Sequence, residues 1–84
     1  MQDSKLKLQK AIAKIIKKYR GYKSISQLSN EIDLSKSVWS ELEKGNKDIQ
    51  LSTLWRIAEA LEISVSTIVT EIEDMLGNDF SFIE

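Results

Sequence analysis

Apolar residues recur at intervals of three and four along this 84-residue chain, a spacing that places them on one face of an α-helix. The chain contains no proline and only 3 glycines, so few positions interrupt a helix. The pattern predicts five helical segments, which span about residues 4–20, 25–32, 36–44, 51–61 and 65–76. We therefore expect an all-α fold.

Residues that favour helix ends mark the boundaries of these segments. Ser24 and Ser35 precede the second and third segments, where a hydroxyl accepts hydrogen bonds from first-turn amides. Gly21, Gly45 and Gly77 follow the first, third and fifth segments, and glycine readily adopts the positive φ that ends many helices. The periodicity and the end signals thus predict the same five segments.

The chain contains neither cysteine nor histidine. We therefore expect no disulfide, no metal site and no catalytic dyad built on these side chains. A glycine-rich phosphate loop and a recognisable pair of catalytic carboxylates are also missing, so the sequence predicts neither an enzyme nor a cofactor. No stretch approaches the ~18 apolar residues of a membrane span, and no secretory leader is evident. We expect a cytoplasmic protein without membrane contact.

Charge is unevenly distributed, although the net charge is only −1. Residues 1–23 have a net charge of +7, residues 24–47 of −1 and residues 48–84 of −7. The lysines of the first segment form a stripe apart from its apolar face: Lys7, Lys10, Lys14, Lys17 and Lys18. This stripe is either a contact for phosphates or an ordinary solvated face.

The third segment has one apolar and one polar side. Val38, Trp39 and Leu42 share the first side, and we expect Trp39, like Trp55 in the fourth segment, to lie in the core or at its edge. The other side consists of Lys36, Ser37, Ser40, Glu41 and Lys44. Because it carries no large apolar residue, this side is suited to enter a groove closely; the alternative is a plain surface helix.

Two helices joined by the short turn Asp33–Ser35 have the spacing of a helix-turn-helix. The residues from Ser24 to Gly45, SISQLSNEIDLSKSVWSELEKG, resemble the Cro and phage-repressor (XRE) helix-turn-helix family. The resemblance covers about residues 8–69, and the ending LEKG at residues 42–45 is among its most specific parts.

This resemblance implies a compact five-helix, lambda-repressor-like DNA-binding domain over residues 1–76, followed by a short tail over residues 77–84. In the family the third helix lies in the major groove of operator DNA. The base-facing residues implied by this position are Lys36, Ser37, Ser40 and Glu41. A lysine donates to guanine O6 or N7, and a glutamate accepts from cytosine N4. Alternatively, Glu41 is solvated and supports Lys44 one helical turn away.

The resemblance also implies contacts with DNA phosphates from the start of the second helix and the loop after the third. These residues are Ser24, Ser26, Gln27, Lys44, Asn46 and Lys47.

The chain departs from the family at several positions. Ile25 stands where a glutamine often contacts the DNA backbone, and Asp33 and Glu62 replace glycines. A left-handed backbone at either acidic residue would cost ~1 kcal/mol. Glu43 pairs with a basic residue of the first helix in this family, and Lys17 is the predicted partner here.

The leading hypothesis is a sequence-specific transcriptional regulator, a repressor that binds palindromic double-stranded DNA as a homodimer. The fifth helix and the tail leave apolar area unaccounted for, which predicts the dimer surface. Its predicted residues are Ile68, Ile72, Met75, Phe80, Phe82 and Ile83. The alternative is a protein-interaction module, such as an antitoxin, that binds a basic protein partner through the acidic segment from Glu71 to Glu84.

Overall fold

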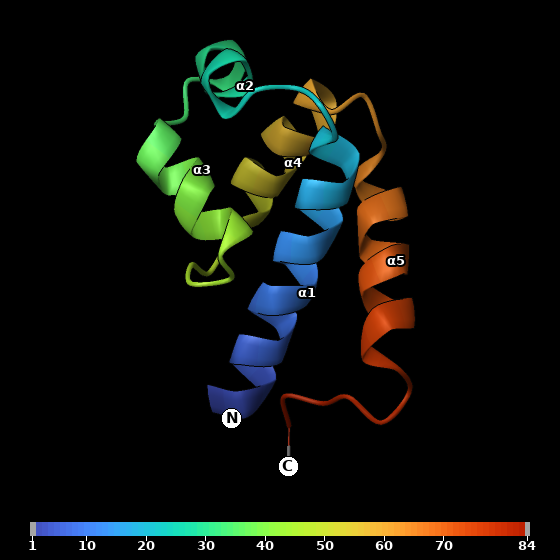
Figure 1. Cartoon of the computed structure of the whole chain (residues 1–84). Helices are drawn as coiled ribbons and strands as arrows, with labels where there is room; N and C mark the ends of the chain where they lie inside the picture. Colours follow the sequence, from blue (N-terminus) through green and yellow to red (C-terminus); the bar gives the residue numbers. More distant parts are fainter. Residues whose placement is uncertain (1, 84) are drawn as a thin grey trace.

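The computed structural model describes residues 2–83, which form five α-helices and no β-strand (Figure 1). The helices are α1 (Gln2–Arg20), α2 (Ile25–Ile32), α3 (Lys36–Glu43), α4 (Leu51–Ala60) and α5 (Val65–Leu76). This confirms the predicted all-α, five-helix fold. Met1 and Glu84, which bound the predicted domain and tail, lie outside the described residues. No helix in the described range is long and apolar enough to cross a membrane.

Serine hydroxyls cap three of the helices. Ser24, Ser35 and Ser64 lie just before α2, α3 and α5, and each accepts a hydrogen bond from a backbone N–H of the first turn. The observed boundaries differ little from the predicted ones. The α1 helix begins two residues earlier, while α3 and α4 each end one residue earlier, with Lys44 and Leu61 as their C-caps.

A left-handed residue follows both α2 and α4. Asp33 has φ 55° and Glu62 has φ 61°, and they occupy the two positions where the family has glycine. The amide of the next residue then reaches back to the preceding helix: Leu34 N donates to Ser29 O and Ile63 N to Ala58 O, each at 3.0 Å. Both helices therefore end in a glycine-type turn without a glycine, and each turn carries backbone strain.

The core takes one completely enclosed large side chain from every helix. These side chains are Ile16, Leu28, Trp39, Ile57 and Ile68. The long α1 packs against α3 on one side and α5 on the other, while α2 packs against α3 and α4, and α4 also packs against α5 (Figure 1). The prediction for Trp39 is confirmed, but the prediction for Trp55 is wrong. Trp55 is 53% exposed because it lies on the outer side of α4, together with Leu51.

Part of the predicted dimer surface is buried within the single chain. Ile68 and Ile72 lie in the core, so their side chains are not available to a second copy, and this part of the prediction is wrong. Phe80 is half-buried beside a groove lined by Leu8, Val69 and Leu76. The Ser4 hydroxyl donates to Ser81 O at 2.7 Å, which fixes the tail beside the start of α1 (Figure 1). Met75, Phe82 and Ile83 remain exposed.

The strained turn after α4 generates a stability prediction. We expect Glu62→Gly to raise the free energy of unfolding by about 0.5 kcal/mol, because relief of the left-handed strain exceeds the backbone entropy that glycine loses on folding. The ion pair of Glu62 with Lys23 spans 3.7 Å between exposed side chains and contributes little. Thermal unfolding should show a midpoint about 2–4 °C higher.

Glu59→Gly is the matched control, because Glu59 is an exposed glutamate within α4. There glycine should lower stability by about 1 kcal/mol. If both variants are destabilised alike, the turn after α4 is not strained.

Candidate nucleic-acid interface

The α3 helix lies at the surface with its apolar side anchored in the core. Trp39 and Leu42 are buried, whereas Lys36 and Ser37 on the opposite side are exposed. The other two predicted base-facing residues, Ser40 and Glu41, are half-buried. All four side chains come from the polar side of α3, so the structure brings the predicted base-facing residues together on an accessible surface.

A short polar network holds the end of α3 against the end of α1. Glu43 accepts two hydrogen bonds from the Arg20 guanidinium, at 2.5 Å and 2.9 Å, and a third from Trp39 Nε1 at 2.6 Å. Arg20 also donates to Lys23 O at 2.8 Å, which ties the α1–α2 turn into the same network. We call Arg20, Trp39 and Glu43 the clamp.

The clamp corrects the predicted partner of Glu43. That partner is Arg20 rather than Lys17. Sequence reasoning missed it because no local pattern determines how the end of α1 lies relative to α3. Burial alone would raise the pKa of Glu43. The hydrogen bonds from Arg20 and Trp39, with the charges of Arg20 and Lys17, outweigh burial and hold this pKa below its usual value.

The loop after α3 rests directly on α1. Gly45 has φ 76°, and a Cβ atom there would lie 3.0 Å from Lys10 Cγ and 3.2 Å from Lys10 Cα, so any other residue would be strained and crowded at this position. In the amide orientation that satisfies both of its neighbours, the Gln9 side chain donates to Gly45 O at 3.2 Å and accepts from Asp48 N at 3.3 Å. These contacts fix the loop that carries Asn46 and Lys47. Sequence reasoning gave no role to Gln9, for which it has no local signal.

The predicted phosphate-contacting residues lie at both ends of the helix-turn-helix. Ser24 and Gln27 are exposed at the start of α2, Ser26 is half-buried, and Lys44, Asn46 and Lys47 are exposed after α3. Ile25 packs against the core, so the start of α2 offers backbone amides where the family often offers a glutamine side chain.

Two residues of the loop region surround Glu41. Asn46 Nδ2 donates to Glu41 Oε2 at 3.2 Å, and Lys44 Nζ lies 4.0 Å from Glu41 Oε1. The Glu41 side chain nevertheless keeps 47% of its surface exposed. The predicted contact between Glu41 and Lys44 is therefore present, and the Glu41 carboxylate remains accessible from the outer side of α3.

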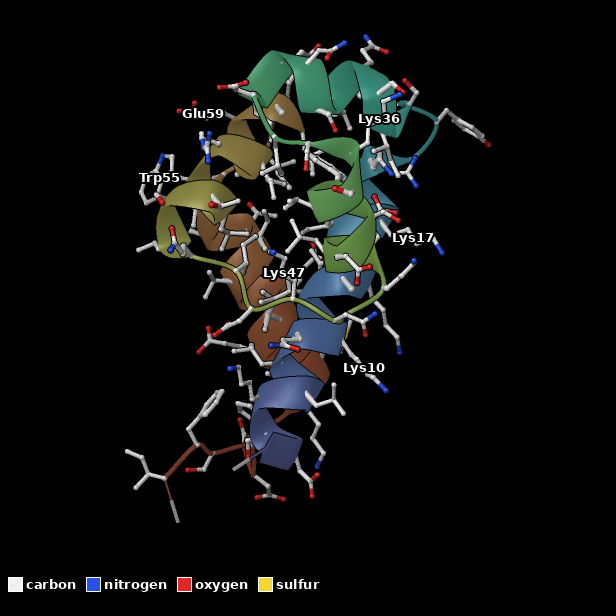
Figure 2. All side chains as sticks on the ribbon, turned by 90° about the vertical axis from the view of Figure 1, so that its left-hand side faces the viewer. Lys10, Lys17, Lys36, Lys47, Trp55 and Glu59 are labelled. Carbon is white, nitrogen blue, oxygen red and sulfur yellow. The ribbon has the colours of Figure 1, made fainter. Side chains whose placement is uncertain are left out.

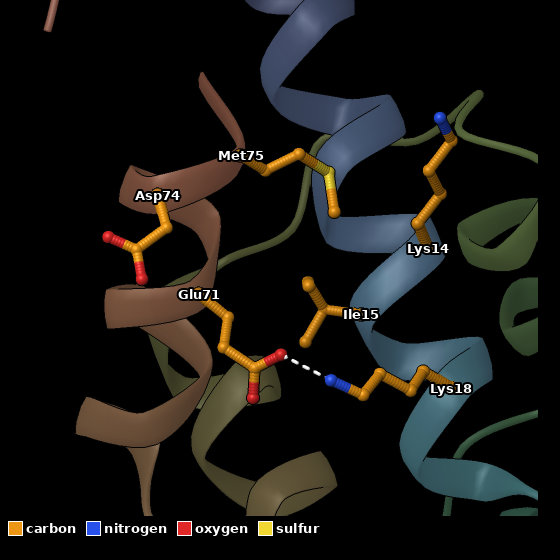
Figure 3. Close-up of a pocket in the computed structure, with 6 residues that line it drawn as sticks. All are labelled: Lys14, Ile15, Lys18, Glu71, Asp74 and Met75. Carbon is orange, nitrogen blue, oxygen red and sulfur yellow. Dashed lines mark hydrogen bonds and ion pairs between the residues drawn. The ribbon is translucent and has the colours of Figure 1, made fainter. Parts of the chain in front are cut away.

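The predicted lysine stripe of α1 is divided between two sides of the molecule. Figure 2 looks onto the side that carries α3 and shows Lys10, Lys17 and Lys36 along one edge, with Lys47 nearer the middle. Lys14 and Lys18 instead line a groove between α1 and α5 that Glu71 and Asp74 also line. In Figure 3, Lys18 reaches Glu71, whereas the Lys14 side chain points away from both carboxylates.

Glu71 neutralises part of the charge on the α5 side. Lys18 Nζ donates to Glu71 Oε1 at 2.7 Å (Figure 3), and the Tyr19 hydroxyl donates to the other carboxylate oxygen. These two hydrogen bonds lower the pKa of Glu71, and the bond to Glu71 raises the pKa of Lys18. Lys18 is therefore committed to a contact within the chain.

Among residues 2–83, no group of three or more Cys, His, Asp or Glu residues is arranged to hold a metal ion.

The comparisons with known proteins agree with this geometry. A family model described as a Cro/C1-type HTH DNA-binding domain matches residues 11–74. Two crystal structures of the clp gene regulator ClgR from Corynebacterium glutamicum are similar to the chain, with TM-scores of 0.73 and 0.72 and 27% sequence identity in each. The similarity covers 77% of this chain in both cases, and 71% and 86% of the two ClgR chains. The comparison with curated proteins found no match.

The clamp generates a prediction for stability and its pH dependence. We expect Glu43→Gln to lower the free energy of unfolding at pH 7 by about 2 kcal/mol, because Arg20 loses its charged acceptor in a site where both side chains are mostly buried. Since folding lowers the pKa of Glu43 from its ordinary 4.5, the stability that it adds is complete above about that pH. This stability is lost as the pH falls through the lowered pKa.

Urea unfolding of the parent and of Glu43→Gln is measured at pH 7 and at decreasing pH. The free energies of unfolding of the two proteins should become more similar as the pH falls. Glu31→Gln is the control, because Glu31 is exposed on α2 and has no ion pair with another described residue. A constant difference at every pH would show that the loss does not come from the carboxylate charge.

Proposed function

Because the chain belongs to the Cro/C1-type helix-turn-helix family of DNA-binding domains, we propose that it is a transcriptional repressor that binds palindromic duplex DNA as a homodimer. The family and the similarity to ClgR support the broader function, a DNA-binding regulator of transcription. Proteins of this kind are not typically enzymes. Repression is the simplest mode of action for such a domain, because a bound domain blocks access to the DNA.

The observation that carries the proposal is the accessible polar side of α3. In this proposal α3 enters the major groove, and Lys36, Ser37, Ser40 and Glu41 face the bases. Lys36 donates to guanine O6 or N7, and Glu41 accepts from cytosine N4. Two features support this role, because they hold the helix in one orientation: the burial of Trp39 and Leu42 in the core, and the clamp at Glu43.

Phosphate contacts fix the register of α3 on the DNA in this proposal. Backbone amides at the start of α2 lie at the positive end of the helix dipole, and Ser24, Ser26 and Gln27 add polar side chains there. Lys44, Asn46 and Lys47 contact the phosphates on the other side of α3. The packing of the loop against α1 supports their role, because it limits the positions that the loop can adopt.

The homodimer depends on which exposed apolar surface meets a second copy. The exposed large apolar residues include Leu51 and Trp55 on α4 and, near the end of the chain, Met75, Phe82 and Ile83; Leu6, Tyr22 and Val69 are also exposed. A two-fold dimer on a palindrome places its two recognition helices one DNA turn apart, ~34 Å, on the same side of the duplex. The dyad must therefore pass beside α3.

We place the dimer contact on α4. Trp55 lies at an edge of the face that carries α3 (Figure 2). The tail instead lies beside the start of α1, away from α3 (Figure 1). The tail, which the sequence predicts as the dimer contact, is the second candidate for this contact.

The alternative function, binding of a basic protein through the acidic segment from Glu71 to Glu84, stays a prediction. Glu71 is already paired with Lys18 and Tyr19, which reduces the charge that this segment offers. Glu84 lies outside the described residues. No contact among the described residues favours this function over DNA binding.

A pair of lysine variants separates base recognition from phosphate contact. We expect Lys36→Ala to relax the base preference at one position of each half-site, whereas Lys47→Ala weakens binding to all sequences alike. Selection of bound sites from random duplex DNA measures both effects and also reveals the symmetry of the site. Unchanged selected sequences and affinities for both variants would contradict the proposed docking.

The dimer contact is tested with Trp55→Lys. We expect this variant to sediment as a monomer at concentrations where the parent forms a dimer, because a charge would have to be buried in the contact. Trp55 is exposed, so the fold should be retained. Phe82→Lys is the control and should leave the dimer intact. The opposite pattern would place the contact at the tail, and a monomeric parent would exclude the homodimer.

A further inference from the structure

Two lysines of α1 lie beside the end of α3, although α1 is not part of the helix-turn-helix. The backbone of Lys10 supports Gly45, since a Cβ on Gly45 would lie 3.2 Å from Lys10 Cα. Two turns further along α1, the charge of Lys17 acts on the carboxylate of Glu43. Lys10 and Lys17 therefore flank the last turn of α3 and the loop that follows it.

Both side chains are free to bind an external anion. Lys10 and Lys17 are exposed, and neither forms an ion pair with another described residue. They share an edge of the α3 side with Lys36, opposite the edge that carries Trp55 (Figure 2). Lys18 is also exposed, but it is paired with Glu71 and lies in the groove beside α5.

The spacing of the two lysines suits a phosphate backbone. Seven residues of α-helix separate them, which is about 10 Å along the helix axis. A strand of duplex DNA carries a phosphate about every 3.4 Å along the duplex axis, so two ammonium groups at this spacing reach different phosphates of one strand.

We propose that α1 forms a second DNA-contacting element, in which Lys10 and Lys17 bind the phosphate backbone beside the site read by α3. This inference rests on the proposed DNA binding and deepens it. Family membership does not imply a contact at Lys10, which lies before the matched residues 11–74. The contact carries no base preference, and it lengthens the stretch of DNA that one protein copy covers.

The test compares single alanine variants of three α1 lysines. Affinity for one 30-base-pair duplex of arbitrary sequence is measured over a series of salt concentrations for Lys10→Ala, Lys17→Ala and the double variant. Lys14→Ala is the matched control, because Lys14 is an exposed lysine on the same helix that lines the groove beside α5. Lys47→Ala reports on the contact that the proposed function already requires, and thermal unfolding verifies that each variant is folded.

We expect Lys10→Ala and Lys17→Ala each to reduce the slope of log K against log[salt] by about 0.9, which is about eightfold in affinity at 0.1 M salt. The double variant should lose about twice that slope, and Lys14→Ala should keep the parent's slope. The inference is overturned if Lys10→Ala and Lys17→Ala keep the parent's slope while Lys47→Ala reduces it. It is also overturned if Lys14→Ala has the same effect as the other two. If the parent itself shows no salt-dependent binding, the proposed function fails as a whole.

Discussion

The hydrogen-bonded ion pair between Arg20 and Glu43 is the interaction on which the geometry of this molecule most depends. It joins the last residue of α1 to the last residue of α3, and Trp39 Nε1 adds a third hydrogen bond to the same carboxylate. A helix as short as α3 has little stability of its own, so tertiary contacts must fix its direction. The clamp and the buried ring of Trp39 supply these contacts from the inner side. The outer side therefore remains free for a ligand.

The α1 helix organises the rest of the fold around this pair. It packs against α3 on one side and α5 on the other, and its start supports both the tail and the loop after α3. Gly45 shows how close this approach is, because a Cβ atom there would lie only 3.0 Å from Lys10 Cγ. Residues from widely separated parts of the sequence therefore form a single surface, in which α1 contributes charge beside the polar side of α3.

The sequence predicted the positions of the helices better than the contacts between them. Apolar periodicity and serine caps placed all five helices within two residues, because these signals are local. The predictions for Trp55 and for Ile68 were wrong for a shared reason: periodicity identifies an apolar face but not the element that covers it. Likewise, the partner of Glu43 depends on where α1 ends relative to α3. That long-range register decides between Arg20 and Lys17, and no local pattern contains it.

Charge separation within the molecule follows from where the acidic residues lie. Glu71 on α5 pairs with Lys18 and Tyr19, so it neutralises α1 only on the side that faces away from α3. Among the described residues, Lys10, Lys17, Lys36 and Lys47 on the α3 side form no ion pair, whereas Lys44 contacts Glu41 and Lys5 contacts Asp48. A chain with a net charge of −1 thereby presents one basic face. The electrostatic field of a basic face orients a domain before it touches a polyanion. The distribution of charge on this small domain therefore matters more than its net charge.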